Sequence, residues 1–218
     1  MSPLLILTTI LAVFISTSIA DPDPIQDFCV GIPAPTNSPA YTGFPCKPES
    51  NVTSDDFYFT GLAATVKTYN RFGTNVSVAN VDTFPGLNTM GLSISRIEHA
   101  PGGLNPPHTH PRATEMVHVI EGRILIGFVS TARRFYSKVL NDGDTFVIPR
   151  GMVHFEYNVG GDTARVMTAF NSQLPGVEAA APSLFGTDPE IPDFVLTKSL
   201  QVDVGVIRLL KSKFQNQN

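Results

Sequence analysis

Eight short apolar segments separated by glycine and proline constrain the fold of this chain more than any other feature. They lie between residues 75 and 171 and are rich in Val, Ile, Leu, Phe and Thr. Short segments of this composition with turn-forming residues between them are typical of strands in a sandwich or barrel. The chain has 218 residues, of which 42% are hydrophobic, so it can bury a sizeable core. The sequence therefore predicts one all-β domain, with strands in NVSVANV, GLSISRIE, EMVHVIEG, RILIGFVS, RFYSKVL, TFVIP, VHFEYNV and ARVMTAFN.

The N-terminus has the pattern of a secretory signal peptide. Its first twenty residues carry no charged side chain and contain an apolar run from Leu4 to Ile15, followed by small residues that end at Ala20. A membrane anchor is the alternative, but the run is short for a bilayer span and polar, proline-rich sequence follows at once. We therefore predict that residues 1–20 are a signal peptide and that the mature protein is secreted.

Residues 21–60 are predicted to form an irregular N-terminal arm. Proline, glycine, asparagine and serine are frequent in its first thirty residues and prevent long regular elements. Cys29 and Cys46 lie in this arm, and the oxidising compartment of a secreted protein favours a disulfide between them over two free thiols.

Two sequons, which begin at Asn51 and Asn75, predict N-glycosylation of a secreted chain. Asn51 lies just before a predicted helix start at Ser54, where a glycan would be crowded. Asn75 is therefore the favoured site.

The charge pattern argues against a nucleic-acid partner. The formal net charge is -4 and the pI is about 5.7, and lysine and arginine are scattered rather than clustered. No basic surface that could neutralise phosphates is expected. Beyond the signal peptide no apolar segment is long enough to span a bilayer, so no membrane partner is expected after cleavage.

The C-terminal residues 196–215 have a helical pattern. Four apolar residues fall on one helical face, with lysine and arginine elsewhere. Gly205 weakens the helix locally. Such a helix either folds back on the β core or forms an interface with a neighbouring chain, and amphipathicity leaves both possibilities open. The apolar residues are Leu200, Ile207, Leu210 and Phe214.

The segment PPHTHPRATE contains three candidate metal ligands, His108, His110 and Glu115. In extended backbone, side chains two residues apart point to the same side, so both imidazoles can reach one ion. Glu115 follows at the start of the next predicted strand, and His154 comes after a proline-glycine turn that can direct it to the same point. Three imidazoles and one carboxylate without a thiolate suit a divalent first-row metal.

Other polar residues have more ordinary interpretations. His118 lies inside a predicted strand and is expected to be a core residue or a neighbour of the ligands rather than a ligand. His99 is expected to have a loop or packing role. Arg112, Arg150 and Glu156 are interpreted as surface charges.

Two spacing patterns contain the candidate ligands. The first pattern consists of Gly102, His108, His110, Glu115 and Gly122, and the second of Gly143, Pro149, Gly151, His154 and Asn158. Together they resemble the two motifs of the cupin superfamily and are complete at every fixed position. The stretches APGGLNPPHTHPRATE, GDTFVIPRGMVHF, AFNSQLPG and LLKSKF, with the paired cysteines, are similar to those of plant germins and germin-like proteins over nearly all of the mature chain.

This resemblance implies a fold, an assembly and a cofactor. The fold is a single cupin β-barrel of the jelly-roll type, with a C-terminal helical extension, over residues 61–218. The assembly is a homohexamer built from dimers and secreted to the apoplast or cell wall, and it favours an interface role for the C-terminal helices. The cofactor is manganese, held by His108, His110, Glu115 and His154.

Two activities occur in the family that the sequence resembles, namely oxalate oxidation with O2 and superoxide dismutation. Two asparagines are implicated in oxalate binding in germins. One of them matches Asn105, whereas the other falls on Ser95, whose shorter side chain lacks an amide donor and acceptor. We therefore expect a superoxide dismutase that generates peroxide, with a role in plant defence. Oxalate oxidase is the alternative, and a non-catalytic cell-wall or receptor-like glycoprotein is the third.

Overall fold

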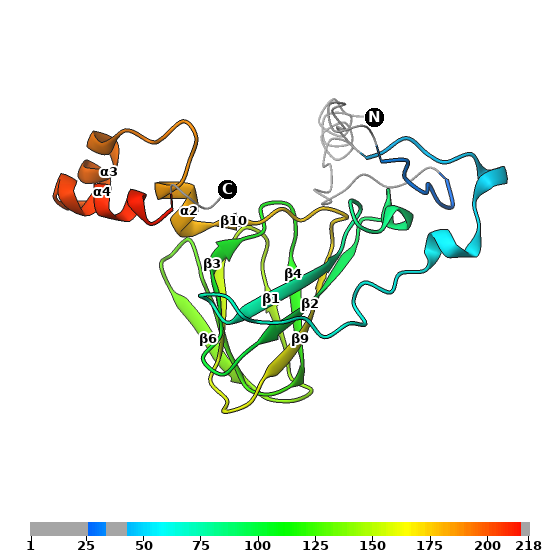
Figure 1. The fold of residues 1–218 in the computed structure, drawn as a ribbon, viewed down its shortest axis with the longest axis horizontal. Coiled ribbons are helices and arrows are strands. Elements are labelled where there is room, and N and C mark those ends of the chain that lie inside the picture. The colour runs from blue at the N-terminus through cyan, green and yellow to red at the C-terminus, as the bar shows by residue number, and fades with distance from the viewer. Residues whose placement is uncertain (1–25, 34–42, 215–218) are drawn as a thin grey trace, which may run out of the picture.

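Two five-stranded antiparallel sheets form the body of the protein (Figure 1). The computed structural model describes residues 26–33 and 43–214. The strands are β1 Thr74–Ala79, β2 Ser93–His99, β3 Leu104–Thr109, β4 Glu115–Glu121, β5 Ile124–Val129, β6 Phe135–Leu140, β7 Thr145–Ile148, β8 Val153–Asn158, β9 Ala164–Phe170 and β10 Glu178–Ala179. One sheet has the order β1-β2-β9-β4-β7 and the other β10-β3-β8-β5-β6. Short 3-10 helices lie at Glu49–Asn51, Ser54–Phe57 and Pro85–Leu87.

The inward-facing side chains of the two sheets form one core. Burial alternates along β4 and along β9, because successive residues of a strand face opposite sides of its sheet. Val117 and Val119 of β4 pack in one cluster with Ile124 and Ile126 of β5, which belongs to the other sheet. Each such side chain stabilises the fold by about 1.5–3 kcal/mol when it is fully buried. The predicted all-β fold is confirmed, and each of the eight predicted segments contains a strand.

Strand β3 is not predicted by the sequence, because two of its six residues are proline. Pro106 and Pro107 have no N–H to donate to a ladder. They lie between Asn105 and His108, where the register of β3 against β8 shifts. Beyond this irregularity His108 is paired directly with His154. The irregularity thus lets a proline-containing strand bring two candidate ligands side by side.

The C-terminal pattern is divided between two helices rather than forming one. The helices of this region are α2 Ala180–Phe185, α3 Asp193–Leu200 and α4 Val204–Ser212. Helix α3 ends at Leu200, and the next residue, Gln201, has a left-handed φ of 55°. Helix α4 begins after Asp203, whose carboxylate accepts a hydrogen bond from the Gly205 N–H at 2.7 Å. Asp203 is an N-cap inside the expected helix, and this capping signal explains the break.

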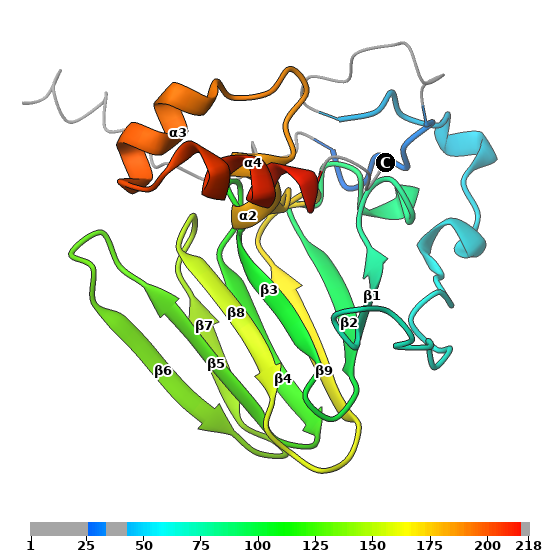
Figure 2. The same cartoon turned by 60° about the vertical axis from the view of Figure 1, so that its left-hand side comes forward.

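The three C-terminal helices pack on one another beyond the end of the barrel at which β10 lies (Figure 1 and Figure 2). Phe185, Leu196 and Ile207 form a small second core between them. Leu200, which the sequence places on the apolar face, is exposed. In the part of the chain that the structure describes, no helix combines the length and the apolar character that a membrane crossing requires.

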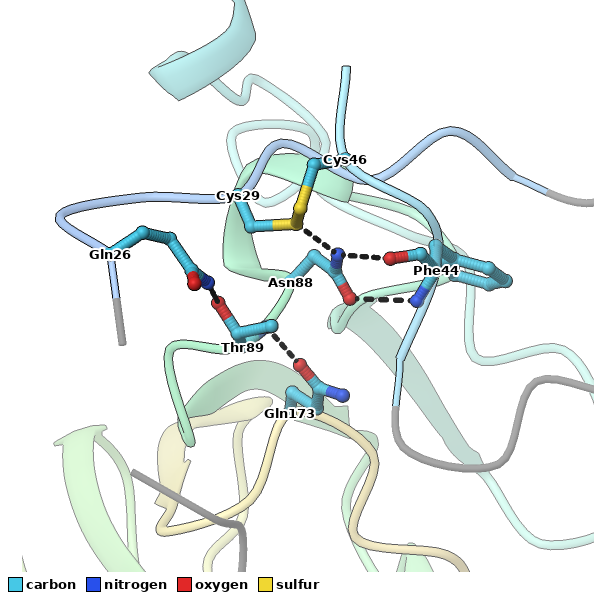
Figure 3. Close-up of a disulfide and its surroundings, with 7 residues drawn as sticks. All are labelled: Gln26, Cys29, Phe44, Cys46, Asn88, Thr89 and Gln173. Carbon is cyan, nitrogen blue, oxygen red and sulfur yellow. Dashed lines mark hydrogen bonds between the residues drawn. A yellow bond between two sulfur atoms is a disulfide. The ribbon is translucent and has the colours of Figure 1, made fainter. Parts of the chain in front are cut away.

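Asn88 ties the N-terminal arm to the loop between β1 and β2 (Figure 3). A disulfide joins Cys29 and Cys46 within the arm. The Asn88 side chain is buried, and it donates to the Phe44 carbonyl at 2.9 Å and accepts from the Phe44 N–H at 3.0 Å. The Asn88 amide nitrogen also lies 3.2 Å from the Cys29 sulfur. The predicted signal peptide, residues 1–20, lies outside the described residues.

The two sequon asparagines differ in exposure. Asn51 is exposed, whereas Asn75 on β1 is half-buried. The Asn75 Nδ2 atom, to which a glycan would be attached, donates a hydrogen bond to the Lys67 carbonyl at 3.0 Å. The exposures therefore favour Asn51, although the sequence favours Asn75.

Candidate metal centre

Four side chains, three from strands and one from the turn after β3, converge inside one end of the barrel. His108 lies on β3 and His110 just after it, Glu115 begins β4, and His154 lies on β8. All four side chains are buried, and one ligand atom from each lies within 4.8 Å of the others. The structure thus brings together the four residues that the sequence and the family resemblance select as metal ligands.

Backbone carbonyls orient the three imidazoles. The Nδ1 atom of His108 lies 2.8 Å from the Pro106 carbonyl, and that of His154 lies 2.8 Å from the Met152 carbonyl. The Nδ1 atom of His110 lies 2.5 Å from the carbonyl of Gly176, in the segment before β10. Because a carbonyl only accepts, Nδ1 carries a proton in each ring, which leaves Nε2 as the nitrogen that can bind an ion. Three Nε2 atoms are thereby directed toward one ion.

Two of the ligand atoms that face the centre have no ordinary hydrogen bond to another protein group. Glu115 Oε2 and His154 Nε2 are buried and make no hydrogen bond among the described residues. They lie 2.9 Å apart, and the Nε2 atom of His110 lies 3.4 Å from the same oxygen. Buried polar atoms are normally satisfied, so these atoms fit a bound cation. The donor set of three imidazoles and one carboxylate also fits a divalent first-row ion.

The four ligands of the metal-free site differ in their protonation. Burial lowers the pKa of His108, and it lowers the pKa of His110 to about 4. Burial also raises the pKa of the Glu115 carboxyl. Burial alone would lower the pKa of His154, but the Glu115 carboxylate, 2.9 Å away, outweighs burial and raises that pKa. His154 and Glu115 therefore share a proton that a metal ion would displace.

Metal binding should release about one proton per site near neutral pH, because an imidazole must lose its Nε2 proton to bind an ion. The raised pKa of His154 identifies this proton, and the apparent affinity should increase with pH until that pKa is passed. His110, with a pKa of about 4, is already neutral and adds nothing to this slope. Calorimetric titration in two buffers of different ionisation enthalpy measures the proton number. An affinity that stays constant from about pH 6 to about pH 8 would contradict this assignment.

The two positions that the resemblance connects with oxalate binding lie on different sheets. Asn105 is on β3, and its Nδ2 donates a hydrogen bond to Glu156 Oε2 at 3.2 Å. Ser95 is buried on β2, where it is paired with Thr168 of β9. Ser95 lies two residues before the core residue Ile97, so both side chains face the barrel interior.

Glu156 and His99 are functional candidates that the sequence analysis does not select. The interpretation of Glu156 as a surface charge is wrong, because its side chain is only 1% exposed. Its Oε2 lies 3.5 Å from His99 Nε2, and His99 is fully buried. The alternation of β8 contains the missing signal, since Glu156 lies two residues after His154 and must face the same side of the strand.

His118 lies apart from the metal centre. It is exposed on the outer face of β4, and its Nδ1 is 3.0 Å from the Thr145 hydroxyl. The expectation of a core residue or a neighbour of the ligands is therefore wrong. Glu115 and Val117 face inward on the same strand, so alternation turns His118 outward.

Comparisons with known proteins agree with this fold and site. The cupin family matches residues 60–208. Germin-like protein 3-8 of Oryza sativa subsp. japonica is 64% identical over 219 residues, which cover 98% of this chain and 97% of that protein. Germin-like protein subfamily T member 2 of Arabidopsis thaliana is 53% identical over 207 residues, which cover 94% of this chain and 92% of that protein.

Solved structures show the same relationship. A recombinant oxalate oxidase in complex with glycolate has a TM-score of 0.86 to this chain at 44% identity, and the match covers 91% of this chain and 100% of the other. The agreement therefore extends beyond the barrel to the arm or the C-terminal region. This chain belongs to the cupin family and, within it, to the germin-like proteins.

Proposed function

We propose that this chain is a secreted, manganese-binding glycoprotein of the plant apoplast that converts superoxide to O2 and hydrogen peroxide. The observation that carries the proposal is the buried group of three imidazoles and one carboxylate whose ligand atoms converge. Manganese is the ion that the germin resemblance implies, and the nitrogen and oxygen donors suit it. Peroxide released at the cell wall would give the protein a part in plant defence.

The protein side of this chemistry is the preparation of the site. Bound manganese would supply one-electron chemistry, by which two superoxide ions and two protons become O2 and hydrogen peroxide. Carbonyl contacts at Nδ1 fix the imidazoles of His108, His110 and His154 with Nε2 directed inward. The Glu115 carboxylate offsets part of the charge of the ion. The Phe170 ring, whose centroid lies 4.7 Å from that of His110, keeps one side of the centre apolar.

The manganese-loaded protein should accelerate the disappearance of superoxide, measured by stopped-flow absorbance. The same protein loaded with zinc is the matched control, because zinc fills an N/O site but does not change oxidation state. We expect turnover with manganese and none with zinc. Equal rates for the two forms, or no rate with manganese, would contradict the proposal.

Oxalate oxidase is the second candidate, and the similarity to a solved oxalate oxidase at 44% identity favours it. Against it stands Ser95, which offers a hydroxyl where the germin resemblance places an asparagine. Incubation of the manganese-loaded protein with oxalate under O2 should therefore release no peroxide. Release of peroxide would replace dismutation by oxalate oxidation as the assigned activity.

A homohexamer is part of the proposal. Large apolar side chains remain exposed on the C-terminal helices, among them Phe194 at 75% and Leu209 at 58%. Contiguous exposed apolar surface is a mark of association. Light scattering of the mature protein should give about six times the mass of one chain. The mass of a single chain would contradict this assembly.

A further inference from the structure

Glu156 is a buried carboxylate beside the metal centre that does not belong to the ligand group. It lies on β8 two residues after His154 and faces the barrel interior. Across the sheet it is paired with Asn105 of β3, just as the ligand His154 is paired with the ligand His108. Its Oε1 atom has no hydrogen-bond partner among the described residues. A carboxylate in this position directs its acceptor oxygens into the interior of the site.

A chain of polar contacts holds Glu156 in place. The Oε2 atom lies 3.5 Å from His99 Nε2, and His99 Nδ1 lies 3.1 Å from the Thr74 hydroxyl. Thr74 in turn donates to the Glu98 carbonyl at 3.1 Å. Because these groups are buried, the carboxylate cannot turn toward solvent. Its position is therefore as fixed as that of the strands that carry it.

Glu156 also accepts a hydrogen bond from an N–H donor that an anionic substrate would need. Asn105 directs its Nδ2 toward Glu156 Oε2 at 3.2 Å, which engages one of its two N–H donors. A substrate carboxylate at the metal would thus lose one hydrogen-bond donor and meet a nearby negative charge. Unpaired or like-charged groups at a binding site discriminate strongly between ligands.

We propose that Glu156 is a specificity-determining residue that makes this metal centre reject dicarboxylates and accept small monoanions. Glu156 presents acceptor oxygens to the site, of which Oε1 has no hydrogen-bond partner among the described residues. A dianion such as oxalate brings a second carboxylate against these acceptors, whereas a monoanion such as glycolate brings a hydroxyl that can donate to them. The proposal rests on the proposed function, because it requires a metal ion at the four-residue group.

The test compares the binding of two anions to the manganese-loaded wild type and to the loaded Glu156→Gln variant. Oxalate is the dianionic probe, and glycolate, of similar size, is the monoanionic probe. Calorimetric titration at one pH and ionic strength gives both affinities, and the manganese electron paramagnetic resonance spectrum reports binding at the ion. We expect the variant to bind oxalate at least about tenfold more tightly, with a smaller change for glycolate.

Glu121→Gln is the matched control. Glu121 lies at the other end of β4, about 20 Å from Glu115 along an extended strand, and it is paired with Arg165 near the surface. Its replacement removes the same charge and should leave both affinities unchanged. If it strengthened oxalate binding as much as Glu156→Gln, a general charge effect would replace the proposed site effect.

The outcomes separate this proposal from the function on which it rests. A wild-type protein that takes up no manganese would overturn the proposed function. A protein that takes up manganese but shows no change, or equal changes, for the two anions would overturn only the role of Glu156. If Glu156→Gln alone fails to fold, the double variant His99→Gln and Glu156→Gln replaces both partners by amides that can bond to each other. The double variant should show the same increase in oxalate affinity relative to glycolate. If this increase is absent, the proposal is overturned.

Discussion

Replacement of His154 by alanine should lower the affinity for manganese by at least about a hundredfold and abolish superoxide turnover. Changes to groups that only support a metal ligand already reduce affinity by about 10–100-fold, so the loss of a ligand should have a larger effect. His154 is also the partner of Glu115 at 2.9 Å, so its removal leaves a buried carboxylate without its closest contact. Metal content after dialysis and the rate of superoxide disappearance measure the two effects.

His118→Ala is the control for this experiment. His118 is an exposed histidine whose side chain contacts the Thr145 hydroxyl, so its loss removes an imidazole without touching the centre. Metal content and turnover should remain at the wild-type level. If His154→Ala retained metal and full turnover, the assignment of His154 as a ligand would be wrong.

Removal of the metal should lower the melting temperature by about 8–16 °C. A ligand that binds only the folded state at a thousand times its Kd stabilises that state by about 4 kcal/mol. For a chain of this size, each kcal/mol corresponds to about 2–4 °C. The ion should stabilise this fold because it satisfies buried ligand atoms. Two of them, Glu115 Oε2 and His154 Nε2, make no hydrogen bond among the described residues. Calorimetric scans of the loaded and the chelator-treated protein measure the shift.

The His154→Ala variant again provides the comparison. Its melting temperature should not depend on added manganese, because its site no longer binds the ion tightly. A metal-dependent shift of equal size in the variant would place the stabilising ion elsewhere. No shift in the wild type would show that the folded protein does not depend on the four-residue group.

The strands could be predicted where their composition was simple, and β3 could not. The eight segments rich in Val, Ile, Leu, Phe and Thr all contain strands. Strand β3 contains Pro106 and Pro107, which have no N–H to donate. A segment with such residues becomes a strand only where the ladder is irregular at the prolines and resumes beyond them. Both conditions arise from tertiary structure. Asp203, a residue that favours helix N-caps, could have predicted the break between α3 and α4. The helical spacing of the apolar residues in this segment favoured one continuous helix instead.

The ligand set could be predicted because its spacing is fixed by the strands, whereas the groups around it depend on three-dimensional packing. His108 and His110 share a face of an extended segment, and that face can be read from two-residue spacing. His99 reaches Glu156 from a different sheet, and no sequence spacing connects strands β2 and β8. Only the inward direction of Glu156 was predictable, from its alternation with His154.

The most direct test of the metal centre is the anomalous diffraction of a crystal of the manganese-loaded protein, measured above and below the manganese absorption edge. The account predicts one anomalous peak per chain, bound by the Nε2 atoms of His108, His110 and His154 and by a carboxylate oxygen of Glu115. A peak at any other position, or a fully loaded crystal without a peak at these four residues, would contradict it.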